Sequence, residues 1–375
     1  MPTLDDVTAL LDRLYPPTLA EPWDSVGLIS GDPQQPIQRV HLALDPTERT
    51  LAEAIEVGAD LLLTHHPLLL KGLTRIPSTS SKGRVLRAAI KNDCALFNAH
   101  TNADRARNGV NDALAAAVGL VDTTPLVPAD EVRLEKIVTF VPHADASRVI
   151  DALAAAGAGS LGDYSRCAFT STGTGTFIPQ DGSSPAIGRP GVPETVQETR
   201  IEMVLAVGHR RAVIDALRSS HPYEEPAFDL LAMVPLPSDQ GLGRVGDLAA
   251  PCTLREYVAR VAQALPRAPV GIRAAGDPDR VVRRAAVLGG SGDSHLDDAV
   301  RAGVDAYLTA DLRHHPASEH LASGGPALID AGHWASESVW LPLAARLLTD
   351  GFDGALRCSV STLCTDPWSL HTPAA

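Results

Sequence analysis

The sequence predicts an α/β fold in which one α/β domain is split into two segments by an inserted ferredoxin-like domain. From residue 1 to about residue 130, predicted helices alternate with short apolar runs, as in repeated units of strand and helix. Over residues 131–235 the order changes to βαββαβ, and over residues 236–375 the first pattern returns. A chain of 375 residues is long enough for two or three domains, each with its own hydrophobic core.

The first segment contains three predicted strands that are apolar along most of their length. They cover residues 40–45, 59–66 and 94–101, and predicted helices over residues 47–57 and 83–92 separate them. Continuous apolar runs of this length are typical of parallel strands that are buried on both faces. The second and third strands end in polar residues, at the carboxyl edge where open α/β sheets place their functional sites.

The inserted segment combines strands and helices in a different order. Its predicted elements are a strand over 135–143, a helix over 146–157, strands over 168–179 and 198–207, a helix over 210–222 and a strand over 227–234. This order is the ferredoxin-like arrangement of the CutA and PII-type proteins. The loop of residues 182–198 is rich in Gly, Pro and Ser, and we expect it to be mobile.

The last segment returns to alternating strands and helices. A strand, a glycine turn and a helix are predicted over residues 283–303, a strand over 305–311, and a strand leading into one long helix over 326–351. The segments DLLLTHH and DAYLTADLRHH resemble each other, which suggests two related halves.

Composition and charge disfavour several classes of protein. A net charge of -13 and a pI near 5.4 oppose the phosphate-driven binding of nucleic acid. The chain begins with an acidic amphipathic helix rather than a signal peptide, and the early run LLLTHHPLLL is far shorter than the about 20 residues of a membrane span. The 5 cysteines form no CxxC pair and are typical of reduced thiols, so we expect a cytoplasmic protein.

Histidines and carboxylates gather where the predicted strands end. Of the 13 histidines, those at predicted strand ends are His65, His66, His100, His314, His315 and His333. Asp104 stands four residues after His100. Glu337 stands four residues after His333, so these two side chains share one face of the last helix. Imidazole and carboxylate groups at one edge of a sheet indicate a metal site.

Each of these motifs alone also has a structural explanation. The pair His65 and His66 is also compatible with an ordinary turn, and Asp104 with a helix cap or turn residue. The pair His333 and Glu337 is compatible with a solvated helix face. The recurrence of histidine at several strand ends favours a metal cleft.

In its motifs and their order, the chain resembles the NIF-three-like family, whose members are often called GTP cyclohydrolase 1 type 2 homologues. The motifs that carry this resemblance, in chain order, are EPWDSVGLISGD, LLLTHHP, NAHTNAD, NGVNDALA, LGRVGDL, GGSGDSHLDDAVRAGVDAYLTADLRHH and DAGHWASESV. They cover essentially the whole chain, and HPYEEPAFDL in the inserted segment matches the subgroup with a CutA-type insertion. One departure is Ala103, where relatives commonly carry a larger apolar residue.

The resemblance implies a centre of two divalent metal ions in a homohexamer. The implied ligands are His65, His66, Asp104, His333 and Glu337, with Glu337 bridging the ions. His100 and His315 match positions near the metals, and we expect them to act as acid or base, to support the ligands or to face the substrate. The implied hexamer is a ring in which the inserted domains pack as trimers. The ligand types suit zinc, iron, manganese, cobalt or nickel equally.

Two functions of different classes remain open from the sequence. One is a metal-dependent hydrolase that acts on a nucleotide or another phosphorylated small molecule through a metal-activated water. The other is a non-catalytic metal carrier or sensor, with the inserted domain as its regulatory module. A scaffold whose metals only stiffen the ring is a third interpretation.

Overall fold

The computed structural model describes residues 1–129, 134–234 and 238–372, and the chain forms two compact units. Unit 1 comprises Met1–Ala129 and Ser238–Ala375, and the inserted unit comprises Asp130–Pro237. The predicted domain boundaries at 130/131 and 235/236 fall on residues outside the described ranges. The first and last thirds of the sequence therefore belong to one folded body.

Unit 1 contains a five-stranded sheet, the first sheet, in the order β1-β4-β3-β2-β17. Its parallel strands are β2 (Arg39–Ala43), β3 (Leu61–Thr64), β4 (Ala95–Asn98) and β17 (Arg357–Val360). The edge strand β1 (Gly27–Ser30) pairs antiparallel with β4. Because β17 comes from the end of the chain and pairs with β2, the two halves of unit 1 are tied together within one sheet.

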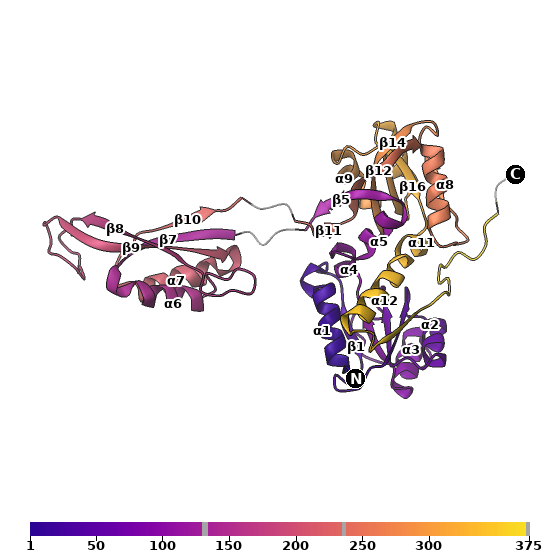
Figure 1. Cartoon of the computed structure of the whole chain (residues 1–375), viewed down its shortest axis with the longest axis horizontal. Helices are drawn as coiled ribbons and strands as arrows, with labels where there is room; N and C mark the ends of the chain where they lie inside the picture. The colour runs from indigo at the N-terminus through magenta and orange to yellow at the C-terminus, as the bar shows by residue number, and fades with distance from the viewer. Residues whose placement is uncertain (130–133, 235–237, 373–375) are drawn as a thin grey trace. The chain divides into compact units, whose positions relative to one another are not determined.

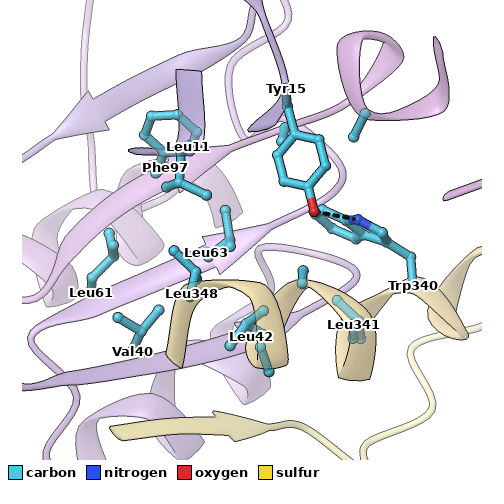
Figure 2. Packing of buried hydrophobic residues seen from close by; sticks show 14 of the residues in the cluster. Leu11, Tyr15, Val40, Leu42, Leu61, Leu63, Phe97, Trp340, Leu341 and Leu348 are labelled. Atoms are coloured by element: carbon cyan, nitrogen blue, oxygen red, sulfur yellow. Dashed lines mark hydrogen bonds between the residues drawn. The ribbon is translucent and has the colours of Figure 1, made fainter. Parts of the chain in front are cut away.

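Helices cover both faces of the first sheet, and the alternation of the strand residues shows which face each helix covers. Leu62 packs in a cluster with residues of α2 (Glu48–Glu56) and α3 (Ser81–Lys91). Leu61 and Leu63 pack on the opposite side in a cluster with residues of α1 (Leu4–Leu14) and α12 (Trp340–Gly351). In that second cluster the indole N–H of Trp340 donates to the hydroxyl of Tyr15, at 3.1 Å (Figure 2).

The second sheet of unit 1 has six strands in the order β13-β16-β15-β14-β12-β5. Its strands are β5 (Leu120–Thr124), β12 (Arg244–Thr253), β13 (Arg273–Ala275), β14 (Val281–Ser291), β15 (Ala306–Ala310) and β16 (Ala327–Asp330). The last three run parallel, so their carboxyl ends share one edge. The helices α5 (Val110–Ala117), α8 (Leu254–Ala264), α9 (Leu296–Arg301) and α11 (His333–Ser338) lie beside this sheet (Figure 1). The helix α10 (His314–Ala322) connects β15 to β16 along the chain.

The inserted unit has a ferredoxin-like topology. Its elements are β7 (Leu134–Pro142), α6 (Ala146–Ala155), β8 (Phe169–Phe177), β9 (Glu194–Ala206), α7 (Arg210–Ser220) and β10 (Phe228–Ala232) (Figure 1). They form an antiparallel sheet in the order β10-β7-β9-β8. The α/β fold class and the βαββαβ order of the insertion are therefore confirmed.

Some elements differ from the sequence prediction. Strand β9 begins at Glu194, so it includes the end of the loop predicted over residues 182–198. Over residues 326–351 the predicted strand is β16, but the single long helix predicted after it is two helices, α11 and α12, which meet at Val339. Short pairings of β6 (Val127–Pro128) with β11 (Gly241–Leu242) were not predicted. No helix among the described residues is both long and apolar enough to cross a membrane.

Candidate metal centre

Three histidines lie at the carboxyl edge of the first sheet. His65 and His66 directly follow β3, and His100 follows β4, whose last residue pairs with the last residue of β3. The backbone N–H of Ala99 donates to the carbonyl of Thr64, which extends this pairing beyond the strands. The ring centroid of His65 lies 5.0 Å from that of His66 and 5.1 Å from that of His100.

Asp104 reaches the same edge from a short helix. It lies in α4 (Thr101–Arg105), one turn after His100, and is buried. The amide of Asn111 donates to the backbone carbonyl of Asp104, and the amide of Asn102 donates to the carbonyl of Tyr15. These bonds fix α4, and they leave the Asp104 carboxylate 3.7 Å from Nε2 of His65.

His333 and Glu337 come from the opposite end of the chain. They lie one turn apart on α11, which begins after β16 and the left-handed residue Gly332 (φ 76°). The Glu337 carboxylate is almost fully buried between three imidazoles. Its Oε1 lies 3.6 Å from Nε2 of His65 and 3.3 Å from Nε2 of His333, and its Oε2 lies 3.1 Å from Nε2 of His66.

Each of the four histidines is oriented by an oxygen acceptor at Nδ1. That atom of His65 donates to the carbonyl of Ala99 at 2.8 Å. The partners of the other three are carboxylates: Asp45 for His66 at 2.7 Å, Asp24 for His100 at 2.9 Å and Asp311 for His333 at 2.7 Å. When the rings are neutral and Nδ1 is the donor, each ring presents the lone pair of Nε2 to the cluster, which is how metal-binding histidines are held.

The inner atoms of the cluster lack hydrogen-bond partners. Nε2 of His65 and Oδ1 of Asp104 are buried, and neither has a hydrogen bond within the described part of the chain, whereas Oε2 of Glu337 has only Nε2 of His66 beside it, at 3.1 Å. A buried lone pair without a donor is costly unless a cation lies beside it. The donor set therefore fits divalent metal ions, because imidazole nitrogens and carboxylate oxygens are their common ligands.

Two overlapping groups of side chains have ligand atoms close enough to share an ion. The first group is His65, His66 and His100, and the second is His66, His333 and Glu337. Within each group the ligand atoms lie within 4.8 Å of one another. His100 thus has the geometry of a candidate ligand, in addition to the five residues named from the resemblance.

Charges within the cluster shift its pKa values strongly. Burial alone would lower the pKa values of His66 and His333. The negative charges of Glu337 and of the aspartates at Nδ1 outweigh burial, so the net pKa is about 10 for His66 and about 11 for His333. Burial and the negative charge of Glu337 raise the pKa of Asp104 to about 7. Burial also opposes ionisation of Glu337, yet the charges of His66 and His333 hold its pKa well below the usual range. The cluster therefore attracts positive charge, as protons or as metal ions.

A glycine pair on β14 packs directly against Glu337. A Cβ atom at Gly290 would lie 2.2 Å from Oε1 of Glu337, and one at Gly289 would lie 3.4 Å from its Cγ. The N–H of Gly290 donates to the hydroxyl of Ser336, and that of Gly289 donates to the side chain of Asn111. These amides are therefore already bonded. The GGSGDS motif acts here as a tight strand end that leaves room for Glu337.

The remaining predicted site residue, His315, lies elsewhere in the single chain. It is exposed in the first turn of α10, and its ring stacks edge to face with that of His314, with centroids 5.2 Å apart. No contact within the described ranges joins it to the four clustered histidines. Asp24, Asp45 and Asp311, by contrast, were not singled out in the sequence. Asp45 and Asp311 end predicted strands, and that position was a usable signal.

An open cavity of about 450 Å³ leads to one side of the cluster. His66 and His333 lie in its wall, together with Asp45 and Asp311. Arg273 and Trp368 also line it, and the guanidinium of Arg273 is paired with Asp330 at 2.6 Å. The cavity therefore gives a small molecule access to His66 and His333.

Comparisons with known proteins agree over nearly the full chain. The model of the family described as Duf34/NIF3 (NGG1p interacting factor 3) matches residues 2–367. A Mycobacterium tuberculosis protein named "GTP cyclohydrolase 1 type 2 homolog" is 49% identical over 368 residues, which cover 98% of this chain and 97% of the relative.

Two solved structures are similar over 99% of both chains. The Bacillus cereus protein related to NIF3 is 37% identical with a TM-score of 0.70. The Staphylococcus aureus protein SA1388 is 29% identical with a TM-score of 0.79. The match of the family model to nearly every residue, with relatives at this identity, shows that the chain belongs to the Duf34/NIF3 family.

Proposed function

We propose that unit 1 binds two divalent metal ions and uses them to hydrolyse a nucleotide or another phosphorylated small molecule. The observation that carries the metal proposal is the arrangement of three imidazoles, His65, His66 and His333, around the buried Glu337 carboxylate, each with Nδ1 bonded and Nε2 directed inward. A structural histidine cluster would need a hydrogen-bond donor beside every buried acceptor, whereas Nε2 of His65 and Oδ1 of Asp104 have none from the described residues.

The five proposed ligands divide into two sets that share one carboxylate. His65 and Asp104 would serve one ion, His66 and His333 the other, and Glu337 both. Support comes from the contacts of Glu337, whose two oxygens face imidazoles of both sets at 3.1–3.6 Å. The proposed ligands include no thiolate. Zinc, iron, manganese, cobalt and nickel all suit this donor set.

The hydrolytic proposal depends on vacant coordination positions and on access. Ions held by so few protein ligands keep water, whose pKa they lower towards about 7, and so supply a nucleophile near neutral pH. The cavity of about 450 Å³ admits a small substrate beside His66 and His333. His100 lies within the cluster with Nδ1 bonded to Asp24, so it is the candidate acid or base from this chain. The name of the Mycobacterium tuberculosis relative, which refers to GTP, favours a nucleotide substrate.

A turnover assay tests this function. Protein stripped of metal and reloaded with each of the five metals is supplied with GTP and with bis(p-nitrophenyl) phosphate, and product is measured. We expect metal-dependent turnover that Glu337→Gln abolishes, because the amide removes the shared anionic ligand. Glu319→Gln, on the exposed side of α10, is the matched control and should leave turnover unchanged.

The second candidate function is a metal carrier or sensor without catalysis. The burial of Glu337 and Asp104 favours firm retention of metal, which both functions allow. If Glu337→Gln loses metal and the native protein consumes neither substrate with any metal, the hydrolase proposal is wrong and the carrier gains support. If chelation dissociates the assembly without loss of any turnover, the metals serve a scaffold.

The assembly and the cellular compartment stay predictions. The resemblance implies a homohexameric ring with trimers formed by the inserted units, in the cytoplasm. Light scattering coupled to gel filtration should give a mass near six times 39.4 kDa. A monomer or dimer at micromolar concentration would contradict the hexamer.

A further inference from the structure

The inserted unit contains a cavity that the proposed metal chemistry does not use. Its volume is about 560 Å³, and it lies over β8, β9 and the segments of residues 178–187 and 223–227. The side chains that matter for its chemistry are Phe140, Phe177, Glu198, Arg200, Tyr223 and Glu224. This volume is in the range of pockets for small organic molecules and is far larger than a single ion needs.

A buried carboxylate forms part of the cavity wall. Glu198 is 8% exposed, and its Oε1 accepts a hydrogen bond of 2.9 Å from the hydroxyl of Tyr223. No Lys, Arg or His nitrogen of the described residues lies within 4.0 Å of this carboxylate. A charged carboxylate in such a position is costly unless a cation or several donors approach it.

Two glycines of β8 make the space around Glu198. Gly173 pairs directly with Glu198 across the sheet, so position 173 and the Glu198 side chain share one face. A Cβ atom at Gly173 would meet nothing within 4 Å, whereas one at Gly175 would lie 2.1 Å from Oε2 of Glu198. A larger residue at position 173 would therefore fill the cavity, and one at position 175 would displace the carboxylate.

The other charged groups leave the cavity acidic. Arg200 is turned to Glu202, with Nε 2.9 Å from Oε1, and its guanidinium lies over the ring of Phe140 at 5.7 Å. Glu224 and Glu225 also line the cavity, and Glu224 accepts the backbone N–H of Ser184 at 3.1 Å. Three carboxylates therefore line the cavity together with one guanidinium, which is already paired with Glu202.

We propose that this cavity binds a small organic cation, a protonated amine carried on an aromatic or similarly sized apolar body. The ammonium would pair with Oε2 of Glu198, which has no donor from the described residues. The rings of Phe177 and Tyr223, with centroids 5.6 Å apart, would contact the apolar body and attract the positive charge. Its lining residues include none of the metal-centre residues, so this site is independent of the proposed hydrolase.

Three probes of similar size and different charge test the proposal. The full-length protein is titrated with 2-phenylethylammonium, 2-phenylethanol and phenylacetate, and binding is followed by saturation-transfer NMR and calorimetry, with and without a chelator. We expect the ammonium to bind in both conditions, the alcohol at least about tenfold more weakly, and the acid not at all.

Two variants locate the site, and a third is the control. Glu198→Gln keeps an acceptor for Tyr223 but removes the charge, so ammonium binding should weaken about tenfold or more. Gly173→Val fills the open space with a residue that strands favour, and should abolish binding without loss of thermal stability. Glu194→Gln lies on the same strand outside the lining residues and should bind normally.

Several results would overturn the proposal. One is equal binding of all three probes, and another is ammonium binding that Glu198→Gln leaves unchanged. Absence of ammonium binding at about 10 mM would do so too. If Gly173→Val instead changes the oligomeric state and no probe binds, the cavity is a contact between copies of the chain and not a ligand site.

Discussion

The substitution Gly290→Ala should disable the metal centre although it replaces none of the proposed ligands. Gly290 has φ 70°, and its missing Cβ leaves the space that Oε1 of Glu337 occupies. In Gly290→Ala the new Cβ would start 2.2 Å from that oxygen, against at least 3.4 Å in an ordinary contact. The carboxylate must therefore move by about 1.2 Å, because the neighbouring group on the glycine side is backbone.

The magnitude has two parts that a second glycine separates. Alanine in a left-handed conformation costs about 1–2 kcal/mol of folding free energy at either position. Gly303 has φ 65°, and a Cβ atom added there would meet nothing within 4 Å, so Gly303→Ala carries the backbone cost alone. A displaced bridging carboxylate should lower metal affinity by at least about 10- to 100-fold, as loss of a supporting group does.

Metal affinity and folding are measured on both variants. Calorimetric titration with zinc and with manganese gives the affinity, and urea unfolding gives the stability. We expect similar stability losses in the metal-free proteins and a loss of metal affinity in Gly290→Ala alone. A folded Gly290→Ala that binds metal as tightly as the unmodified protein would refute the proposed role of Glu337.

Further predictions concern the groups around the cluster. Asp311→Ala removes the acceptor at Nδ1 of His333 and should weaken metal binding about 10- to 100-fold in calorimetry. In metal-free protein, the raised pKa values of His66 and His333 add stability that is fully present below pH 6.5. This stability is lost as the pH rises through about 10, so the free energy of unfolding in urea should fall over that window. Metal-loaded protein should not show that fall, and an identical profile for the two forms would contradict the assignment. Arg244 is buried, pairs with Asp112 and donates to backbone carbonyls. Arg244→Ala should therefore lower the free energy of unfolding by on the order of 3 kcal/mol. A loss below about 1 kcal/mol would contradict this structural role.

The strand-end rule explains which parts of the centre could be predicted. His65 and His66 follow a strand of four buried residues, and in a parallel sheet such ends share an edge with the end of β4. The spacing of His333 and Glu337 on one helix face was equally readable. These local patterns needed no knowledge of which distant segments meet.

The groups that hold the histidines could not be found in this way. Asp24 bonds to His100 across 76 positions, and Asp45 bonds to His66 across 21. A lone aspartate has many structural explanations, and its pairing depends on the tertiary arrangement of the strands.

Strand β17 was not predicted, and His315 was expected near the metals, for reasons that lie in the local sequence. Strand β17 has four residues of which none is fully buried, so it lacks the apolar run that marks the other parallel strands. His315 shares the strand-end position, yet α10 begins at His314 and leaves both side chains exposed. Position after a strand therefore predicts nearness to the sheet edge, but the following helix decides the direction of the side chain.

Anomalous diffraction from crystals grown without a chelator tests the dinuclear centre most directly. Data collected at the absorption edge of the metal found by elemental analysis should show two peaks per chain. One should lie between His65 and Asp104 and the other between His66 and His333, with Glu337 in contact with both. No peak, or a single peak after reloading with excess metal, would contradict the account.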